Sequence, residues 1–334
     1  MQTHSLLCRL VGCFELLTQR SRFDRHWRFG GLSMEFVQNH PSVRMRDPND
    51  VCMKVEKFTN DKPEHLLVIA DFDHTLSRTK NHAGEECCIS YGVFEMDALR
   101  RSPERAKCFA QLTEKYLPIE LSTTMTSEEK APYMVEWWQK SNDYILETKY
   151  TENEIEDLVA KSSIDLRDDV DLMIHDLDRH SVPLLIFSAG IGNIIDICLR
   201  KKMGSVPKNV HLVSNMMLFD AEGIACRFSE PLIHTFCKNG SMIERCPSLS
   251  KEIAGRFNVL LLGDSLGDLH MADGYRPNGD EITVLKIGFL NRAFDTHYEK
   301  FLCGFDIVLV DDQTMHLPRH LIHKIAATDA VCRE

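Results

Sequence analysis

Residues 66–75 read LLVIADFDHT, five apolar residues followed at once by two aspartates that flank a phenylalanine. Apolar runs of this kind, without polar interruption, are typical of strands buried on both faces of a parallel sheet. In an extended chain, residues two apart point the same way, so Asp71 and Asp73 can face one ligand while Phe72 turns into the core. The stretch therefore predicts a strand that delivers two carboxylates at its carboxyl end.

Similar apolar runs follow along the chain, with amphipathic helical patterns between them. The runs cover residues 182–187, 209–214, 258–262, 282–287 and 305–310. In one of these patterns, apolar residues at i, i+4, i+7, i+8 and i+11 lie on one face of a helix. They are Leu166, Val170, Met173, Ile174 and Leu177. Alternating strands and helices predict an α/β fold with a Rossmann-like, doubly wound parallel sheet.

Residues 80–164 interrupt this alternation, because they contain no convincing buried strand and are rich in Glu, Lys and helix formers. The simplest interpretation is an α-helical cap domain, inserted after the first strand and lying over the crevice where open α/β sheets bind ligands. The core would then comprise residues 41–79 and 165–334. Residues 1–40 would form an N-terminal extension that we expect to be poorly ordered.

Composition excludes several classes of partner. The net charge of −11 argues against polymeric DNA or RNA, since proteins that bind them are usually basic. No run approaches the roughly 18 apolar residues of a membrane span, so no membrane association is expected. Twelve cysteines without a C-x-x-C pair argue against a zinc ribbon and favour a reducing compartment, so we expect a cytoplasmic protein. We also expect a monomer.

Two further strand ends and one lysine carry polar groups suited to phosphate chemistry. Ser188 and Ala189 precede a predicted helix, whose free backbone amides make a phosphate cradle. The stretch GDSLGD at residues 263–268 combines turn-forming glycines with Asp264 and Asp268, whose carboxylates suit a hard ion such as Mg²⁺. Lys238 can neutralise a transferring phosphoryl group. Each signal is weak alone, because aspartates often end strands as caps, but their order and placement together indicate phosphoryl transfer.

The order of these motifs resembles that of the haloacid-dehalogenase superfamily, and longer stretches resemble the cytosolic 5′-nucleotidase III family, also called the pyrimidine 5′-nucleotidases. The stretches are DFDHTLS (71–77), YLPIE (116–120), MVEWWQKS (134–141), FSAGIG (187–192), LIHTFCKN (232–239), LLGDSLGDLHMADG (261–274) and LKIGFLN (285–291). The resemblance covers residues 40–312. It implies a Rossmann-like core with a helical cap and Mg²⁺-dependent hydrolysis of nucleoside 5′-monophosphates.

The resemblance also implies roles for individual residues. Asp71 matches the nucleophile and a magnesium ligand, and Asp73 matches the general acid–base, which also gives its backbone carbonyl to the metal. Asp264 matches the other protein ligand of the metal, and Asp268 a supporting carboxylate. The positions that match the phosphate site are Ser188, Ala189 and Lys238. The chemistry agrees, since a carboxylate can attack phosphorus and divide the hydrolysis into two easier steps.

In the cap, Glu120 matches a residue that contacts the base, and Ser141 matches a second substrate contact. Trp138 matches an aromatic residue beside the base, with Tyr91 expected opposite. Taken without the family, Glu120 is a solvated acid and the aromatic residues are cap packing. For Trp137, one residue away, we prefer the packing interpretation.

Trp138 stands where pyrimidine-preferring members carry Tyr, so the chain resembles the 7-methylguanosine-phosphate-specific subtype. A cationic methylated purine would gain a cation–π interaction there. We therefore expect 7-methylguanosine monophosphate together with CMP and UMP as substrates. Four residues depart from the subtype and leave the base preference open: Glu85 and Glu86 stand where basic residues are usual, Ser141 is closer to the pyrimidine subtype, and His74 replaces a Met.

Two alternatives remain. One is another phosphatase of the same superfamily, such as a phosphoserine phosphatase, which the cap motifs disfavour. The other is a nucleotide-binding module without turnover. The complete set of Asp71, Asp73, Lys238 and Asp264 disfavours that alternative, because a binding protein does not need a nucleophile.

Overall fold

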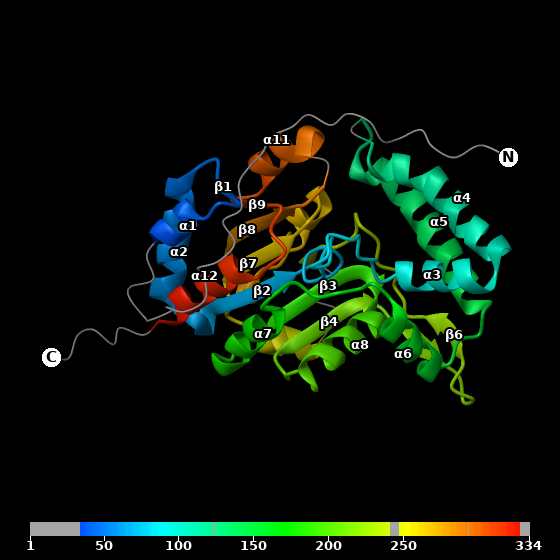
Figure 1. Ribbon diagram of the computed structural model, residues 1–334. Coiled ribbons are helices and arrows are strands. Elements are labelled where there is room, and N and C mark those ends of the chain that lie inside the picture. The colour runs from blue at the N-terminus through cyan, green and yellow to red at the C-terminus, as the bar shows by residue number, and fades with distance from the viewer. Residues whose placement is uncertain (1–33, 123, 241–246, 293, 328–334) are drawn as a thin grey trace. The chain divides into compact units, whose positions relative to one another are not determined.

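The computed structural model describes residues 34–122, 124–240, 247–292 and 294–327, and their strands form a central seven-stranded sheet (Figure 1). The strand order is β1-β9-β8-β7-β2-β3-β4. The bounds are β1 Val43–Arg44, β2 Leu66–Ala70, β3 Leu184–Ile191, β4 Val210–Asn215, β7 Asn258–Gly263, β8 Thr283–Leu290 and β9 Ile307–Val310. Neighbouring strands are parallel except for the short β1, which pairs antiparallel with β9. The predicted parallel sheet is confirmed, and each of the six apolar runs forms a strand.

Both faces of the sheet are covered, as the doubly wound fold requires. Along β2, Leu66, Val68 and Ala70 belong to one apolar cluster, whereas Leu67 and Ile69 belong to another. This alternation follows from the period of two along a strand. The helices on the first face are α2 Pro48–Asp61, α7 Val170–Arg179, α8 Gly192–Met203 and α12 His316–Ala326. Those on the second are α10 Pro247–Glu252 and α11 Phe294–Gly304.

The segment between β2 and α7 is helical, as the sequence predicts. Its helices are α3 Gly92–Arg101, α4 Pro103–Glu120, α5 Ser127–Leu146 and α6 Glu152–Lys161. Local signals set their starts: Ser102 caps α4 just before a proline at its first position, and Thr126 and Thr151 each form a reciprocal capping box with the glutamate three residues on. Helices α4 and α5 lie side by side (Figure 1).

Helix α6 differs from its neighbours in what it packs against. Ile155 and Leu158 are buried in the same apolar cluster as α8 of the core. The two-stranded sheet of β5 Met217–Phe219 and β6 Ala225–Phe228 lies next in the chain after β4, and Ile224 just before β6 forms a bridge to Thr151 at the start of α6. The last helix of the expected cap is therefore attached to the core by its apolar side.

The N-terminal extension lies mostly outside the described residues, which begin at Met34. From there the chain forms the short helix α1, Met34–Asn39, in place of the disorder expected up to residue 40. Val37 is fully buried in the core cluster, and the Phe36 ring stacks on His320 with centroids 4.2 Å apart. Packing against α12 holds this end of the extension in place.

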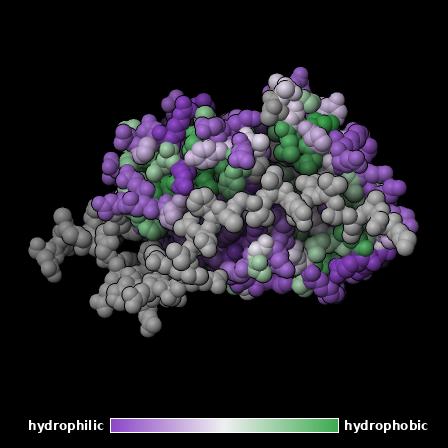
Figure 2. Space-filling view, turned by 45° about the horizontal axis from the view of Figure 1, so that its top comes forward, coloured by the Kyte–Doolittle hydropathy of each residue, from purple (hydrophilic) through white to green (hydrophobic). Residues whose placement is uncertain are grey.

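Apolar residues on the surface are scattered. Figure 2 shows polar side chains over much of the visible face, with apolar residues in separate small groups. The large apolar side chains with the highest exposure among the described residues are Met53, Ile89, Leu99, Leu117, Leu121, Tyr133, Leu172 and Phe294, which come from six helices and two loops. Scattered exposure of this kind is normal for a folded protein. None of the described helices is both long and apolar enough to span a membrane.

One buried carboxylate joins α7 to α12. Asp176 accepts hydrogen bonds from Arg319 Nε at 2.6 Å and from Arg179 at 3.0 Å, and its Oδ2 lies 2.6 Å from His323 Nε2. Burial alone would raise the pKa of Asp176, but the Arg319 and His323 partners outweigh it and lower the pKa. Because the folded-state pKa is the lower one, the stabilisation is complete at neutral pH and is lost only as the pH falls through that value.

We expect Asp176→Asn to lower the free energy of unfolding at neutral pH by roughly 1–3 kcal/mol, since the charge-assisted bonds are weakened inside the protein. Urea titration followed by circular dichroism measures this change. Asp178→Asn, exposed two residues further along the same helix, is the matched control and should change stability by less than about 0.5 kcal/mol. Equal effects of the two substitutions would contradict the prediction.

Candidate active site

The carboxyl ends of β2, β3 and β7 meet at one edge of the sheet. Since β2 lies between β7 and β3, Asp71 at the end of β2 has Asp264 on one side and Ser188 on the other. Strand β3 runs on through Ser188 to Ile191, with an irregular register after Phe187. Helix α8 therefore begins at Gly192. The ends of these strands thus bring Asp71, Ser188 and Asp264 to the same edge of the sheet.

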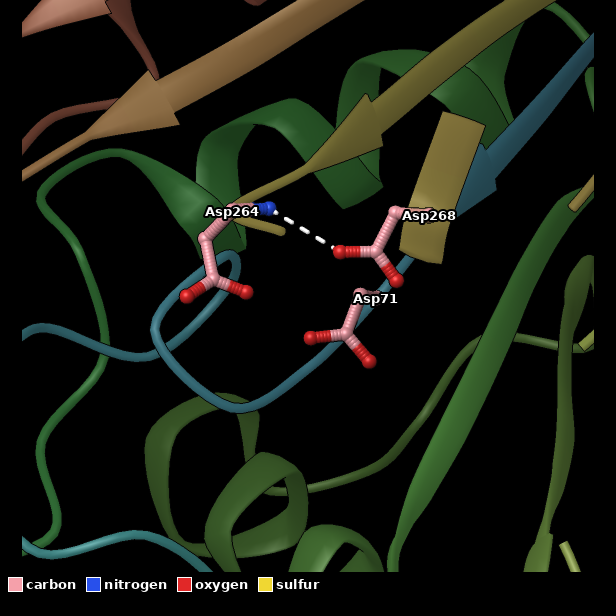
Figure 3. A group of neighbouring side chains, drawn as sticks. All are labelled: Asp71, Asp264 and Asp268. Carbon is pink, nitrogen blue, oxygen red and sulfur yellow. Dashed lines mark hydrogen bonds between the residues drawn. The ribbon is translucent and has the colours of Figure 1, made fainter. Parts of the chain in front are cut away.

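Three carboxylates gather here. Asp71, Asp264 and Asp268 each place a carboxylate oxygen within 4.8 Å of the others, and Figure 3 shows the three groups clustered around one point. Asp268 also shapes the loop, because its Oδ2 accepts from the backbone N–H groups of Asp264 and Ser265 and from the Ser265 hydroxyl. Gly263 is required, since a Cβ there would lie 2.4 Å from Asp268 Cβ.

One cation compensates part of this charge. Lys238 Nζ lies 2.8 Å from Asp71 Oδ1 and 2.5 Å from Asp268 Oδ1. Burial by itself would lower the pKa of Lys238, but the two carboxylates outweigh burial and raise it, so the lysine stays charged. This lysine comes from a loop far along the chain, and it is buried together with its two partners.

Lys238 compensates the negative charge of the three carboxylates only in part. Burial raises the pKa of Asp71 to about 7, although Lys238 opposes the shift. The pKa of Asp264 is raised well above its usual range, by burial first and then by Asp268 and Asp71. Carboxylate oxygens are the ligands that a hard divalent cation prefers, and such an ion would supply the missing charge. The residues present are therefore consistent with a divalent metal site.

Asp73 does not join this group. Its Oδ1 accepts from the Ser90 backbone N–H at 2.8 Å and its Oδ2 from the Ser90 hydroxyl at 2.6 Å. Burial raises the pKa of Asp73 even though these two bonds oppose the shift. Ser90 is fully buried, and a Cβ on Gly190 would lie 2.1 Å from its Oγ. Ser90 precedes α3, so the first residues of the helical segment hold the side chain of Asp73.

The phosphate-site candidates on β3 lie beside Asp71. Ser188 is buried, and its Oγ accepts from the Gly190 N–H at 3.0 Å. The carbonyl oxygen of Ala189 accepts from Trp138 Nε1 at 2.8 Å and from Asn215 Nδ2 at 2.8 Å. Trp138 lies on α5, so this bond links the inserted helices directly to the strand that carries Ser188.

The aromatic candidates lie together rather than across an open slot. The rings of Tyr91 and Trp138 are 6.1 Å apart and nearly perpendicular, and the Tyr91 hydroxyl donates to Asn142 Oδ1 at 2.8 Å. Ser141 is buried on α5, three residues after Trp138 and so near the same helix face. The packing interpretation of Trp137 is confirmed, because its ring stacks on Tyr116 at 5.8 Å.

Glu120 reaches the core from the end of α4. Its Oε1 accepts from the Thr235 hydroxyl at 2.7 Å, and its backbone carbonyl accepts from Lys130 Nζ at 2.9 Å. Burial raises the pKa of Glu120, with Thr235 and Lys130 pulling the other way. The interpretation of Glu120 as a freely solvated acid is therefore wrong, because its carboxylate is held between the inserted helices and the core.

Three of the residues that depart from the subtype pattern, His74, Glu85 and Glu86, lie between β2 and α3. His74 adopts a positive φ of 62°, and burial lowers its pKa to about 4, so it is uncharged at neutral pH. Glu85 accepts from Asn81 at 2.9 Å, and Glu86 forms an ion pair with Arg292. Both acids thus have a polar or charged partner.

Sequence reasoning missed Ser90, Thr235 and Arg167. The fully buried Arg167 donates to the carbonyl oxygens of Thr75, His74 and Asp312, and its guanidinium lies over the Phe289 ring at 4.3 Å. It thereby holds the turn that follows Asp73. The only sequence signal for it is an arginine inside the helical stripe that begins at Leu166, which by itself indicates nothing specific.

Comparison with known proteins identifies the family. The family model for pyrimidine 5′-nucleotidase (UMPH-1) matches residues 74–326. A putative cytosolic 5′-nucleotidase 3 of Caenorhabditis elegans is 43% identical over 87% of this chain and 77% of its own length. The 7-methylguanosine phosphate-specific 5′-nucleotidase A of Xenopus laevis is 38% identical over 87% of this chain and 98% of its own length.

A solved structure agrees with the sequence comparisons. The crystal structure of cytosolic 5′-nucleotidase IIIB bound to cytidine superposes with a TM-score of 0.76 and 32% sequence identity, and the match covers 87% of this chain and 97% of that one. The resemblance to the cytosolic 5′-nucleotidase III family found from the motifs is confirmed. The chain belongs to the pyrimidine 5′-nucleotidase (UMPH-1) family.

Proposed function

We propose that this protein is a Mg²⁺-dependent 5′-nucleotidase that hydrolyses 7-methylguanosine monophosphate, CMP and UMP through a phosphoaspartate on Asp71. The observation that carries the proposal is the position of Asp71. Its carboxylate lies among Lys238, Asp264 and Asp268, beside the backbone of Ser188 and Ala189. The family and its relatives are 5′-nucleotidases, which removes the support for a phosphoserine phosphatase or a binding module without turnover.

In the first step, an Asp71 carboxylate oxygen attacks phosphorus while the bond from phosphorus to the 5′ oxygen breaks. The leaving alkoxide takes a proton from Asp73, which burial favours in its protonated form. In the second step, Asp73 removes a proton from water, which attacks the phosphoaspartate and releases inorganic phosphate and free Asp71. Lys238 offsets negative charge on the transferring group throughout.

Asp71 and Asp264, with the backbone carbonyl of Asp73, would hold the magnesium ion, and Asp268 would support them. When bound, Mg²⁺ would offset the repulsion between the nucleophile and the anionic phosphate. Ser188 and Ala189 would bind the phosphate oxygens. The support is the all-oxygen donor set and the excess of buried negative charge around Asp71.

For the base, we propose contacts with Glu120, Ser141, Trp138 and Tyr91. Glu120 can accept from the amino group of cytosine or from the Watson–Crick edge of guanine. The Trp138 ring can stack on a base, and a 7-methylated purine adds a cation–π interaction. Relatives named for 7-methylguanosine phosphate and a related structure bound to cytidine support both kinds of base.

We further propose that residues 80–164 act as a cap over a core of residues 41–79 and 165–334. The bonds from Trp138 to Ala189 and from Thr235 to Glu120, which join α5 and α4 to the core, support this division. We propose a cytoplasmic location as well, because one relative is named cytosolic and the cysteines of the described residues are all unpaired. A monomeric state, and the absence of membrane and nucleic-acid partners, stay predictions from the sequence.

Asp71→Asn should lower kcat for CMP at least roughly a thousandfold, because an amide cannot serve as the nucleophile. Phosphate release measures the loss, and the thermal midpoint of unfolding checks that the variant is folded. Asp178→Asn is the matched control and should keep parental turnover. Turnover of Asp71→Asn within about tenfold of the parent would exclude Asp71 as the nucleophile.

Chelation should abolish phosphate release, and added Mg²⁺ should restore it. Without substrate, Mg²⁺ should also raise the thermal midpoint, because a cation that binds only the folded protein stabilises it. Asp264→Asn should lose most of that increase, whereas Asp178→Asn should keep it. Full activity after exhaustive chelation would refute metal dependence.

Trp138→Tyr should lower kcat/KM for 7-methylguanosine monophosphate about fivefold more than for CMP, because a smaller ring gives a weaker cation–π contact. The variant also loses the hydrogen bond from Trp138 to the Ala189 carbonyl oxygen. Because both substrates use the phosphate site, this loss affects them equally and cancels in the ratio of their kcat/KM values. Trp137→Tyr is the control, because the neighbouring Trp137 packs on Tyr116, and it should leave the ratio of the two kcat/KM values unchanged. An unchanged ratio in Trp138→Tyr would mean that Trp138 only packs.

A further inference from the structure

One short segment touches both ends of the proposed nucleotide site. We call residues 234–238 (HTFCK) the bridging loop. At its carboxyl end, Lys238 pairs with Asp71 and Asp268. Near its amino end, the Thr235 hydroxyl donates to Glu120 Oε1 at 2.7 Å. Only two residues, Phe236 and Cys237, therefore separate the cation at the phosphate end from the donor that holds the proposed base contact.

The middle of the bridging loop is anchored in the inserted helices. Phe236 packs against the apolar cluster of α4 and α5 that includes Tyr116 and Trp137. Lys130 Nζ lies 5.0 Å from the centroid of the Phe236 ring, and the same ammonium donates to the Glu120 carbonyl oxygen. The loop and the end of α4 are thus held by an apolar contact, a cation–π contact and two hydrogen bonds.

Thr235 is also confined from the core side. A Cβ added at Gly267, in the loop that carries Asp264 and Asp268, would lie 3.1 Å from the methyl carbon of Thr235 and 3.0 Å from its carbonyl oxygen. The side chain of Thr235 therefore has close neighbours on one side, and its hydroxyl faces Glu120 on the other. A β-branched residue restricts its own χ1 rotation, which further limits where that hydroxyl can point.

The Glu120 carboxylate is only half satisfied. Thr235 occupies Oε1, whereas Oε2 has no hydrogen-bond partner among the described residues. A carboxylate can accept on both oxygens, so Oε2 remains for an N–H donor. Cytosine offers its amino group, and guanine offers its amino group and N1–H.

We propose that Thr235 is a specificity-determining residue, whose hydroxyl positions the Glu120 carboxylate so that Oε2 accepts from the N–H groups of the base. The inference rests on the proposed function, because it assumes that Glu120 reads the base. Thr235 contacts no reacting atom in this arrangement and acts through Glu120. The bridging loop then keeps the base-reading carboxylate at a constant distance from Lys238.

Thr235→Val tests the proposal, because it removes the hydroxyl and keeps the shape of the side chain. The parent and the variant are compared on CMP and on ribose 5-phosphate, which has the sugar and the phosphate but no base. We expect the ratio of kcat/KM for CMP to that for ribose 5-phosphate to fall at least about fivefold, mainly through KM for CMP.

Two further variants separate the hydroxyl from packing. Thr235→Ser keeps the hydroxyl and should hold the ratio within about twofold of the parent. Thr283→Val, at the amino end of β8 and away from the site, is the matched control for the substitution itself and should leave the ratio unchanged.

An unchanged ratio in Thr235→Val, with a parent that prefers CMP, would overturn the role of Thr235 and leave the proposed function standing. An equal loss in Thr235→Ser would also overturn it, because the methyl group rather than the hydroxyl would then be responsible. If the parent hydrolysed ribose 5-phosphate with the same kcat/KM as CMP, base recognition itself would be refuted, and the inference with it.

Discussion

Buried negative charge at the carboxyl edge of the sheet is the constraint on which the rest of the site depends. Three carboxylates share a small volume with one ammonium group, Lys238. Removing such charges from water costs several kcal/mol each unless partners compensate them. Asp268 accepts three hydrogen bonds from its own loop, which offset this cost. The negative charges of Asp71 and Asp264 are less well compensated, so the pKa values of both are raised. That imbalance suits a site that must attract a cation and an anionic substrate together.

Buried polar contacts hold the segment that follows Asp71 in place. A buried arginine is costly without partners, and Arg167 donates to two carbonyl oxygens of the turn after Asp73 and to that of Asp312. Ser90 donates one hydrogen bond to each carboxylate oxygen of Asp73. Both contacts fix positions on the scaffold before any ligand arrives, which is how a preorganised site reduces the cost of reaching its transition state.

Much of this could be predicted from local sequence, because the evidence for it is periodic or adjacent. The run LLVIA before Asp71 specifies a strand buried on both faces, and parallel strands bring their carboxyl ends to one edge. GDSLGD carries its own turn, since Gly263 and the Ser265–Asp268 capping box are within a few residues of each other. The capping boxes that start α5 and α6 are equally local.

The amino-acid sequence by itself thus determined the sheet, the order of the motifs and the edge of the sheet to which they are brought. Only the tertiary structure decided what each side chain binds. Asp73 turns to Ser90, 17 residues away, although alternation along a strand pointed it toward the partners of Asp71. The carbonyl oxygen of Thr75 accepts from Arg167, 92 residues away in the chain, and the carboxylate of Glu120 accepts from Thr235, 115 residues away. Such pairs follow from how helices and loops pack on the sheet, and no periodic pattern in the chain records which distant donor will lie within hydrogen-bonding distance of a given oxygen.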